Sequence, residues 1–197
     1  MSIIFILFAF FLGSIPWGYI IGKLKGIDLR QVGSGNIGAT NVLRTIGKKE
    51  ALITLLLDIS KGAIPVLVVR IVPPYGEDLL LMGLVGVFAV VGHCYTPFLR
   101  FKGGKGVATT IGVLLAYMPL AGLITVLIWI ITFKISKISS LSALISFSLL
   151  PLNVYILDYP EETKLLSFLF TSIIYIRHIQ NIKRLLRGEE LRIGDKR

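Results

Sequence analysis

Residues 106–137 read GVATTIGVLLAYMPLAGLITVLIWIITFKISK, and the number of times this stretch crosses a membrane decides the fold. One interpretation is a single span that runs through Pro119. The other is two shorter helices, 106–117 and 119–133. A helix of about 12 residues rises only about 18 Å, which is short for a hydrocarbon core of about 30 Å. The choice therefore rests on the charges that flank all the apolar segments.

The composition of the chain indicates a membrane protein. Of 197 residues, 54% are hydrophobic and only 16% are charged, whereas about 25% are charged in a typical soluble domain. The mean hydropathy is +0.81. These values exclude a soluble globular domain, a disordered chain and a collagen-like fibre, and the single cysteine excludes a disulfide framework. The net charge of +10 indicates basic cytoplasmic loops, and we expect no nucleic-acid partner.

Apolar residues gather in seven segments, so we predict an all-α polytopic membrane helix bundle with seven transmembrane helices. The segments are 2–22, 51–70, 79–99, 106–117, 119–133, 138–157 and 163–179. The first has neither a basic leading region nor a cleavage signal, and we expect a retained anchor. No long linker divides the chain, so residues 1–197 are expected to form one domain.

The distribution of charge favours seven spans with the N-terminus outside and the C-terminus cytoplasmic. In that arrangement the inside segments hold 18 of the 21 Lys and Arg residues. These segments are 23–50, 100–105, 134–137 and the tail after 176. A single span over 106–133 would instead place Lys134, Lys137 and the basic tail outside. The positive-inside rule therefore predicts that the chain turns back at Pro119.

The segment 23–50 contains the glycine-rich run GSGNIGATN, residues 33–41. Glycine allows close approach to the backbone, and successive N–H groups can then converge on an anion. A helix that begins near Ala39 would point its free N–H groups at the same place. The alternative is a tight turn with small residues for helix packing.

Two further clusters carry basic residues beside polar or glycine-rich sequence. GHCYTPFLRFKGGKGVATT, residues 92–110, places Lys105 between glycines just before a helix that we expect to start around Gly106. The alternative there is an ordinary basic loop with a hinge. In YIRHIQNIKRLL, residues 175–186, His178 and Asn181 are three residues apart and share a helix face. Snorkelling basic residues at the end of a span are the alternative.

Other polar residues lie within the apolar segments. Asp58 and Lys61 are three residues apart and are expected to form a structural ion pair. His93 and Cys94 are adjacent, so they point to different sides of a helix and make a poor nucleophile–base pair. A cluster of serines opens the sixth segment and either caps that helix or contacts a polar substrate. It consists of Ser136, Ser139, Ser140 and Ser142.

In this order, GSGNIGATN, GHCYTPFLRFKGGKGVAT and RHIQNIKRL resemble the three motifs of the bacterial acyl-phosphate:glycerol-3-phosphate acyltransferase family. The resemblance runs essentially from end to end of the chain. The family's second motif usually has a proline directly after the aromatic residue, whereas Thr96 precedes Pro97 here. The HxxxxD pair of other glycerolipid acyltransferases is absent, because residue 98 is Phe and residue 183 is Lys.

The resemblance implies a bacterial inner-membrane enzyme whose site faces the cytoplasm. It would transfer an acyl group from acyl phosphate to the 1-hydroxyl of sn-glycerol 3-phosphate, giving lysophosphatidic acid and phosphate in the first step of phospholipid synthesis. Because acyl phosphate has a good leaving group, we expect direct transfer without an acyl-enzyme. The hydroxyl proton passes either to the leaving phosphate or to His178.

The motifs then supply the expected site residues. We predict that Lys105, His178, Asn181 and Ser34 are catalytic. Acyl phosphate is expected to bind Gly33, Ser34, Gly35, Asn36, Gly38, Thr40, Asn41, Gly103, Gly104 and Lys105. Glycerol 3-phosphate is expected to bind Arg44, Lys105, Ser142, His178 and Asn181. No metal or other cofactor is expected. Besides the substrates and the lipid bilayer, we expect a transient contact with the enzyme that makes acyl phosphate.

Two other classes of protein remain as alternatives. A transporter of small organophosphates or anions would also place glycine-broken helices and cations in a bundle, with corresponding broken segments in two halves. A purely structural membrane protein would not need Lys105, His178 and Asn181 beside glycine-rich loops.

Overall fold

The computed structural model describes residues 2–194, and every regular element in that range is a helix. Two helices precede the first long loop, α1 (Ser2–Ser14) and α2 (Trp17–Leu24). The next elements are α3 (Ala39–Thr45), α4 (Lys48–Ile71), a short 3₁₀ turn η1 (Tyr75–Glu77), α5 (Leu79–Cys94) and a second turn η2 (Pro97–Leu99). The rest are α6 (Val107–Tyr117), α7 (Pro119–Ser136), α8 (Ser139–Ser148), α9 (Leu150–Ile156), α10 (Glu161–Arg177) and α11 (Ile179–Leu186).

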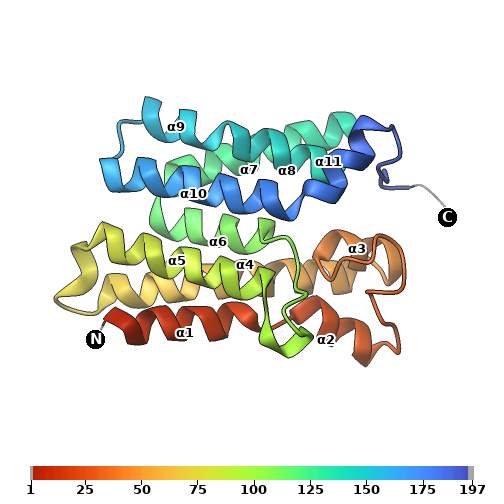
Figure 1. Cartoon of the computed structure of the whole chain (residues 1–197), viewed down its shortest axis with the longest axis horizontal. Helices are drawn as coiled ribbons and strands as arrows, with labels where there is room; N and C mark the ends of the chain where they lie inside the picture. Colours follow the sequence, from red (N-terminus) through yellow and green to blue (C-terminus); the bar gives the residue numbers. More distant parts are fainter. Residues whose placement is uncertain (1, 195–197) are drawn as a thin grey trace.

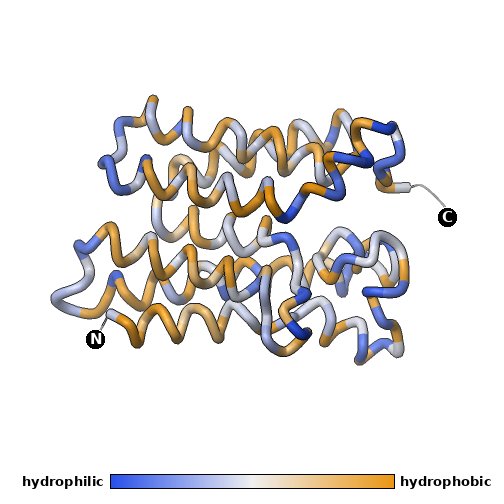
Figure 2. The backbone as a smooth tube through the Cα atoms, in the orientation of Figure 1, coloured by the Kyte–Doolittle hydropathy of each residue, from blue (hydrophilic) through white to orange (hydrophobic). Residues whose placement is uncertain are grey.

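Most helices run roughly along one direction and form a bundle with two distinct ends (Figure 1). α5 packs on α1, α4, α6 and α10, α4 also packs on α6, and α7 packs on α6 and α8. Apolar residues occupy most of the length of the helices, whereas hydrophilic residues gather toward the two ends of the bundle (Figure 2). Large apolar side chains such as Ile4, Leu7 and Leu123 are exposed on the sides of the bundle, as expected where lipid replaces water.

Within residues 2–194, five helical stretches are long and apolar enough to cross a membrane. They are Ser2–Leu24, Lys48–Ile71, Leu79–Leu99, Pro119–Ser136 and Ser139–Ile156. Val107–Tyr117 is apolar but shorter, as the sequence predicts for the fourth segment. The expected seventh segment, 163–179, corresponds to α10, which has 17 residues and begins with two glutamates.

The chain does turn at Pro119, so the single-span interpretation of 106–133 is wrong. Met118 adopts φ −135° and ψ 76°, which ends α6, and Pro119 begins α7. Proline has no N–H to donate and is favoured at the first helical position, so the break and the restart occupy adjacent residues. α6 and α7 are separate helices that pack against each other.

Close packing of α4 on α6 depends on glycines. A methyl group at Gly62 would lie 2.0 Å from the carbonyl oxygen of Thr109, and one at Gly112 would lie 1.9 Å from that of Ile59. Small residues of this kind allow helix backbones to approach closely in membranes. α4 and α6 therefore pack closely together, and residues of both helices line the cavity described below.

The buried ion pair expected on the second segment is present. Lys61 Nζ lies 2.8 Å from Asp58 Oδ1, and both side chains are almost completely buried. Lys61 Nζ also donates to the carbonyl oxygen of Ile15 at 2.7 Å. Ile15 lies in the break between α1 and α2, where its carbonyl oxygen also accepts from the Trp17 N–H at 3.1 Å, so the lysine ties α4 to this break. The pair therefore has a structural role at this break.

Candidate active site

A cavity of about 660 Å³ lies where the three sequence clusters meet. Its polar end is formed by the loop before α3, by α3 itself, by the loop before α6 and by α11 with the tail. The predicted residues that line it are Gly33, Ser34, Asn36, Gly38, Thr40, Asn41, Arg44, Lys105, His178 and Asn181. Stretches more than 60 residues apart in the sequence thus meet at one end of the bundle, at the right of Figure 1.

The glycine-rich loop is organised around the side chain of Asn41. Its amide nitrogen donates to the carbonyl oxygens of Leu29, Val32 and Asn36 at 2.8–3.1 Å. Its amide oxygen accepts from the Ser34 N–H at 2.9 Å. We expected Asn41 to donate to acyl phosphate, but its polar atoms are already engaged inside the loop. Its position favours a role in shaping the cradle.

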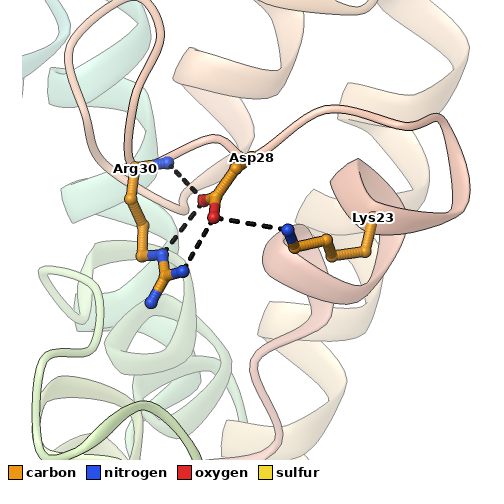
Figure 3. Close-up of polar contacts among 3 residues, drawn as sticks. All are labelled: Lys23, Asp28 and Arg30. Atoms are coloured by element: carbon orange, nitrogen blue, oxygen red, sulfur yellow. Dashed lines mark hydrogen bonds and ion pairs between the residues drawn. The ribbon is translucent and has the colours of Figure 1, made fainter.

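The same loop is tied to α2 by Asp28 (Figure 3). The Arg30 guanidinium forms two hydrogen bonds with this carboxylate, at 3.0 and 2.7 Å, and Lys23 forms an ion pair with it at 3.4 Å. The hydrogen bonds from Arg30 hold the pKa of Asp28 well below its usual range. The start of the loop is therefore fixed at physiological pH.

The helix that follows the loop begins at Ala39, as predicted, but it contains only seven residues. A helix this short has a small dipole, so α3 contributes less to anion binding than the sequence suggests. A side-chain contact with another helix holds α3 in place. Thr40 Oγ1 lies 3.0 Å from Ser139 Oγ, at the start of α8.

Lys105 lies in the loop between α5 and α6, one residue before the glycine that precedes α6. Burial lowers the pKa of Lys105 from 10.5 to about 8; the Glu190 carboxylate opposes this shift, and Arg184, Arg177 and Arg44 add to it. A cation surrounded by three guanidinium groups and one carboxylate is short of negative charge. An anionic ligand in the cavity would therefore be strongly favoured.

The two glycines before Lys105 do not line the cavity. The N–H groups of Gly103 and Gly104 donate to the carbonyl oxygens of Cys94 and His93, each at 3.1 Å. Their carbonyl groups accept from Arg177. We expected these glycines to bind acyl phosphate, but the structure uses their backbone groups to hold the loop.

His178 and Asn181 both line the cavity, although they do not share one continuous helix. α10 ends at Arg177 and α11 begins at Ile179, so His178 lies at the break. His178 Nδ1 lies 2.7 Å from the carbonyl oxygen of Ile174. That contact places the proton on Nδ1 and leaves Nε2 as the ring nitrogen for a ligand.

Of the four serines near α8, Ser139 and Ser140 line the cavity, whereas Ser142 does not. Ser142 is fully buried and donates to the carbonyl oxygen of Ile138 at 2.8 Å. Ser136 likewise bonds within its own turn, to the carbonyl oxygen of Thr132. Gly35, another predicted binding residue, also lies outside the lining. Ser139 and Ser140 thus reach the cavity, where their hydroxyl groups contact Thr40 and Glu190, and Ser142 does not.

The sequence interpretation missed Glu190, which fastens the tail across the polar end of the cavity. Its carboxylate accepts from Ser140 at 2.7 Å, from Asn181 at 2.5 Å and from Arg184 at 2.6 Å. Burial raises the pKa of Glu190, but these three donors outweigh that effect and lower it. The sequence signal was an acidic pair, Glu189 and Glu190, in a tail whose charged residues are mostly basic.

The rest of the cavity is apolar and runs between α4, α6 and α7. Its lining residues there are Leu52, Leu55, Ile59, Ile111, Leu115, Val126, Trp129, Ile130 and Phe133. Trp129 and Phe133 stack with ring centroids 4.9 Å apart. An alkyl chain would fit such a wall, whereas a small polar ligand would not use it.

Asp58 and His93 add polar groups to the cavity lining. His93 Nδ1 lies 3.8 Å from Asp58 Oδ1, and both side chains are buried. Cys94 is also buried and is not part of the lining. Within residues 2–194, no three His, Cys, Asp or Glu side chains come together as a metal site.

Comparisons with known proteins agree with this fold. A glycerol-3-phosphate acyltransferase from Agrobacterium fabrum is 48% identical over 96% of this chain and 91% of its own length. One from Aquifex aeolicus is 41% identical over 97% of this chain and 98% of its own. A crystal structure of PlsY, an integral membrane glycerol 3-phosphate acyltransferase in its glycerol 3-phosphate form, superposes with a TM-score of 0.92. That protein is 41% identical, and the match covers 98% of this chain and 96% of the other.

A second crystal structure of PlsY, in a lysophosphatidic acid form, superposes with a TM-score of 0.90 at 39% identity. The sequence model that describes glycerol-3-phosphate acyltransferases matches residues 3–188, nearly the whole chain. The chain therefore belongs to the glycerol-3-phosphate acyltransferase family, whose members include multi-pass integral membrane enzymes.

Proposed function

We propose that this protein transfers a fatty acyl group from acyl phosphate to the 1-hydroxyl of sn-glycerol 3-phosphate. The products are lysophosphatidic acid and inorganic phosphate, and the reaction begins phospholipid synthesis. The observation that carries the proposal is a single cavity that joins a cationic end to an apolar wall. Acyl phosphate has the same two parts, a phosphate and an alkyl chain, and it has them directly next to each other.

The acyl chain would lie along the apolar wall of α4, α6 and α7. Its phosphate would then reach the glycine-rich loop, where Ser34 and Asn36 line the cavity, and the ammonium group of Lys105. Glycerol 3-phosphate would enter from the polar end, beside Arg44, His178 and Asn181. Both phosphates would thus lie beside cations. Binding of the two substrates next to each other would bring the hydroxyl of glycerol 3-phosphate close to the acyl carbon.

The chemistry is a direct displacement. The hydroxyl oxygen of glycerol 3-phosphate attacks the acyl carbonyl carbon, the carbon–oxygen bond to phosphate breaks, and phosphate leaves with the bonding electrons. The hydroxyl proton goes to the leaving phosphate or to Nε2 of His178. Lys105 stabilises the negative charge that develops on the phosphate. No acyl-enzyme is needed, in keeping with the burial of Cys94 away from the cavity lining.

We also propose seven membrane crossings, with the N-terminus outside and the site on the cytoplasmic side of the bacterial inner membrane. Several contacts support this arrangement. The Ile193 N–H donates to the carbonyl oxygen of Lys137, and Thr40 contacts Ser139, so the basic segments lie at one end of the bundle. Asp158 and Glu161 pair with Lys164 near the opposite end (Figure 1). The described chain also begins and finishes at opposite ends, as an odd number of crossings requires.

The test is an assay of the purified protein in lipid mesophase or detergent, in which phosphate release from acyl phosphate is measured with and without glycerol 3-phosphate. Release that depends on glycerol 3-phosphate supports the proposal, and acyl-CoA in place of acyl phosphate should give neither lysophosphatidic acid nor free CoA thiol. Lys105→Ala should abolish release, whereas Lys102→Ala, an exposed lysine of the same loop, should retain it. Well-folded native protein that releases no phosphate would favour transport or scaffolding.

A further inference from the structure

The segment that leads into Lys105 is held along one edge by the end of α5. The Gly103 N–H donates to the carbonyl oxygen of Cys94, and the Gly104 N–H donates to that of His93, each at 3.1 Å. These acceptors are among the last carbonyl groups of α5, which have no partner within their own helix. The N–H groups of this segment are therefore satisfied by α5.

The opposite edge of the same segment is held by one side chain from α10. Arg177 Nη2 donates to the carbonyl oxygens of Gly103 and Gly104, at 3.1 and 3.0 Å, and Nε donates to Gly104 at 3.1 Å. The guanidinium carbon lies 4.9 Å from the ring centroid of Tyr95, so the group is also stacked. One planar fork thus bridges two consecutive peptide groups.

The fit leaves no room for a side chain on the segment. A methyl group at Gly103 would lie 2.0 Å from the carbonyl oxygen of His93, and one at Gly104 would lie 2.2 Å from Nε2 of that histidine. The segment thus packs directly against the end of α5, and both its N–H groups and its carbonyl groups are hydrogen-bonded. Lys105 is the next residue, so the direction of its side chain is set by these contacts.

We propose that Arg177 is a positioning residue: its guanidinium fixes the two peptide groups before Lys105 so that the ammonium group enters the cavity. Arg177 itself is not part of the cavity lining, so it acts on the substrate only through Lys105. This inference rests on the proposed function, in which Lys105 stabilises the leaving phosphate.

Arg177 also contributes to the electrostatic environment of Lys105. The charged or titratable groups that face Lys105 are Arg44 from α3, Arg177 from α10, Arg184 from α11, Glu190 from the tail and His178 at the α10–α11 break. Removal of the charge of Arg177 takes one of the cations away, so the pKa of Lys105 should rise. A substitution of Arg177 that keeps the positive charge but loses the planar guanidinium should leave the pKa of Lys105 near its native value.

Two substitutions separate position from charge. Arg177→Lys keeps a cation but cannot bridge two carbonyl groups, and Arg177→Gln loses both properties. Both should lower kcat by about tenfold or more, because charge-assisted hydrogen bonds to the loop are lost. The KM for glycerol 3-phosphate should change much less. Arg187→Gln removes an exposed cation after α11 and serves as the matched control with native kcat.

The second readout is the rate at which acetic anhydride labels Lys105, followed by peptide mass spectrometry across pH. Only the unprotonated amine reacts, so the profile reports the pKa of Lys105 even in an inactive variant. Arg177→Gln should shift this profile to higher pH, and Arg177→Lys should not. Native kcat in Arg177→Lys would overturn the proposal, and so would a labelling profile in Arg177→Lys that shifts enough to account for its lost kcat.

The outcomes keep the two proposals apart. Full activity in Lys105→Ala would refute the role of Lys105 in the proposed function, whereas loss in Lys105→Ala with native kcat in Arg177→Lys would refute only the present inference. If neither Arg177 variant folds, Tyr95→Leu removes the ring on which the guanidinium stacks, so the three hydrogen bonds to the loop are held less firmly. It should lower kcat several-fold with little change in KM, and a native kcat there would also count against the proposal.

Discussion

At the scale of single residues, the site depends on a lysine whose charge is poorly stabilised before substrate arrives. Burial and three neighbouring guanidinium groups bring the pKa of Lys105 down to about 8, close to physiological pH. The amine is charged below that pH and neutral above it. A bound phosphate would restore the missing negative charge, so ligand binding and protonation of Lys105 should favour each other.

This gives a prediction about pH. The native kcat/KM should fall as pH rises through about 8, because free enzyme loses the positive charge that stabilises the leaving phosphate. Lys105→Arg keeps its charge throughout this range, so its decline near pH 8 should be absent even if its overall rate is lower. The measurement is kcat/KM from pH 6 to 10, corrected for spontaneous hydrolysis of acyl phosphate. Identical alkaline declines in both proteins would contradict the assignment.

Asn41 is a second residue whose effect can be isolated. Asn41→Asp keeps the oxygen that accepts from Ser34 but removes the donors to Leu29, Val32 and Asn36. The free energy of unfolding should fall by about 1–3 kcal/mol, because buried carbonyl groups lose their partners. The KM for acyl phosphate should rise as the cradle loosens.

Thermal unfolding in detergent and steady-state kinetics measure these two effects. Gln31→Glu makes the same amide-to-carboxylate exchange on an exposed residue of the same loop and is the control. Native stability in Asn41→Asp would show that the loop does not depend on this amide.

At the scale of elements, the polar end of the cavity is assembled by links between helices that are distant in sequence. Thr40 on α3 meets Ser139 at the start of α8, and Glu190 in the tail joins Ser140 of α8 to Asn181 and Arg184 of α11. The short helices α3 and α11 could not hold these positions alone. The end of the bundle is therefore a set of mutually dependent pieces.

Loss of the tail contact should loosen this assembly. Glu190→Gln removes the charge that Arg184 and Asn181 bind, and it should lower the free energy of unfolding by about 1–3 kcal/mol. Because the folded pKa of Glu190 is lowered, its contribution is present near neutral pH and is lost as pH falls through that folded value. Unfolding of the native and Glu190→Gln proteins between pH 3 and 7 should therefore converge at the acid end.

Glu189→Gln provides the comparison for this experiment, since Glu189 is exposed and adjacent in the sequence. It should unfold like the native protein. Equal stability of the two glutamine variants at pH 7 would mean that the Glu190 carboxylate does not fasten the tail.

At the scale of the whole molecule, the two ends of the bundle differ in charge. The loops at the end that carries the cavity hold most of the lysines and arginines, whereas the α4–α5 and α9–α10 loops at the other end carry acidic residues (Figure 1). This asymmetry is the basis for the proposed orientation.

Cysteine labelling tests the orientation directly. Cys94 is fully buried, and Cys94→Ala supplies a background without a native thiol. In that background, Glu77→Cys should react with an impermeant maleimide added to intact spheroplasts. Arg192→Cys should react only after the membrane is permeabilised. Reaction of the tail thiol from outside would reverse the proposed topology and move the site to the outer face.

The sequence by itself determined the membrane environment, the helical class, the turn at Pro119 and the three polar clusters. These features depend on composition and on interactions between near neighbours, such as the missing N–H of proline or the i, i+3 spacing of Asp58 and Lys61. Because these interactions join residues that are close in the sequence, the sequence alone is enough to predict them.

Only the tertiary structure decided which residues of each cluster reach the cavity. Gly103, Gly104 and Ser142 carry the right chemistry for a ligand but lie outside the lining, whereas Asn41 lies in the lining with its amide engaged by the backbone of its own loop. Glu190 and Arg177 acquire their importance from contacts with residues on other helices. Which polar groups reach a ligand depends on contacts between segments far apart in the chain, and the order of residues along the sequence does not show those contacts.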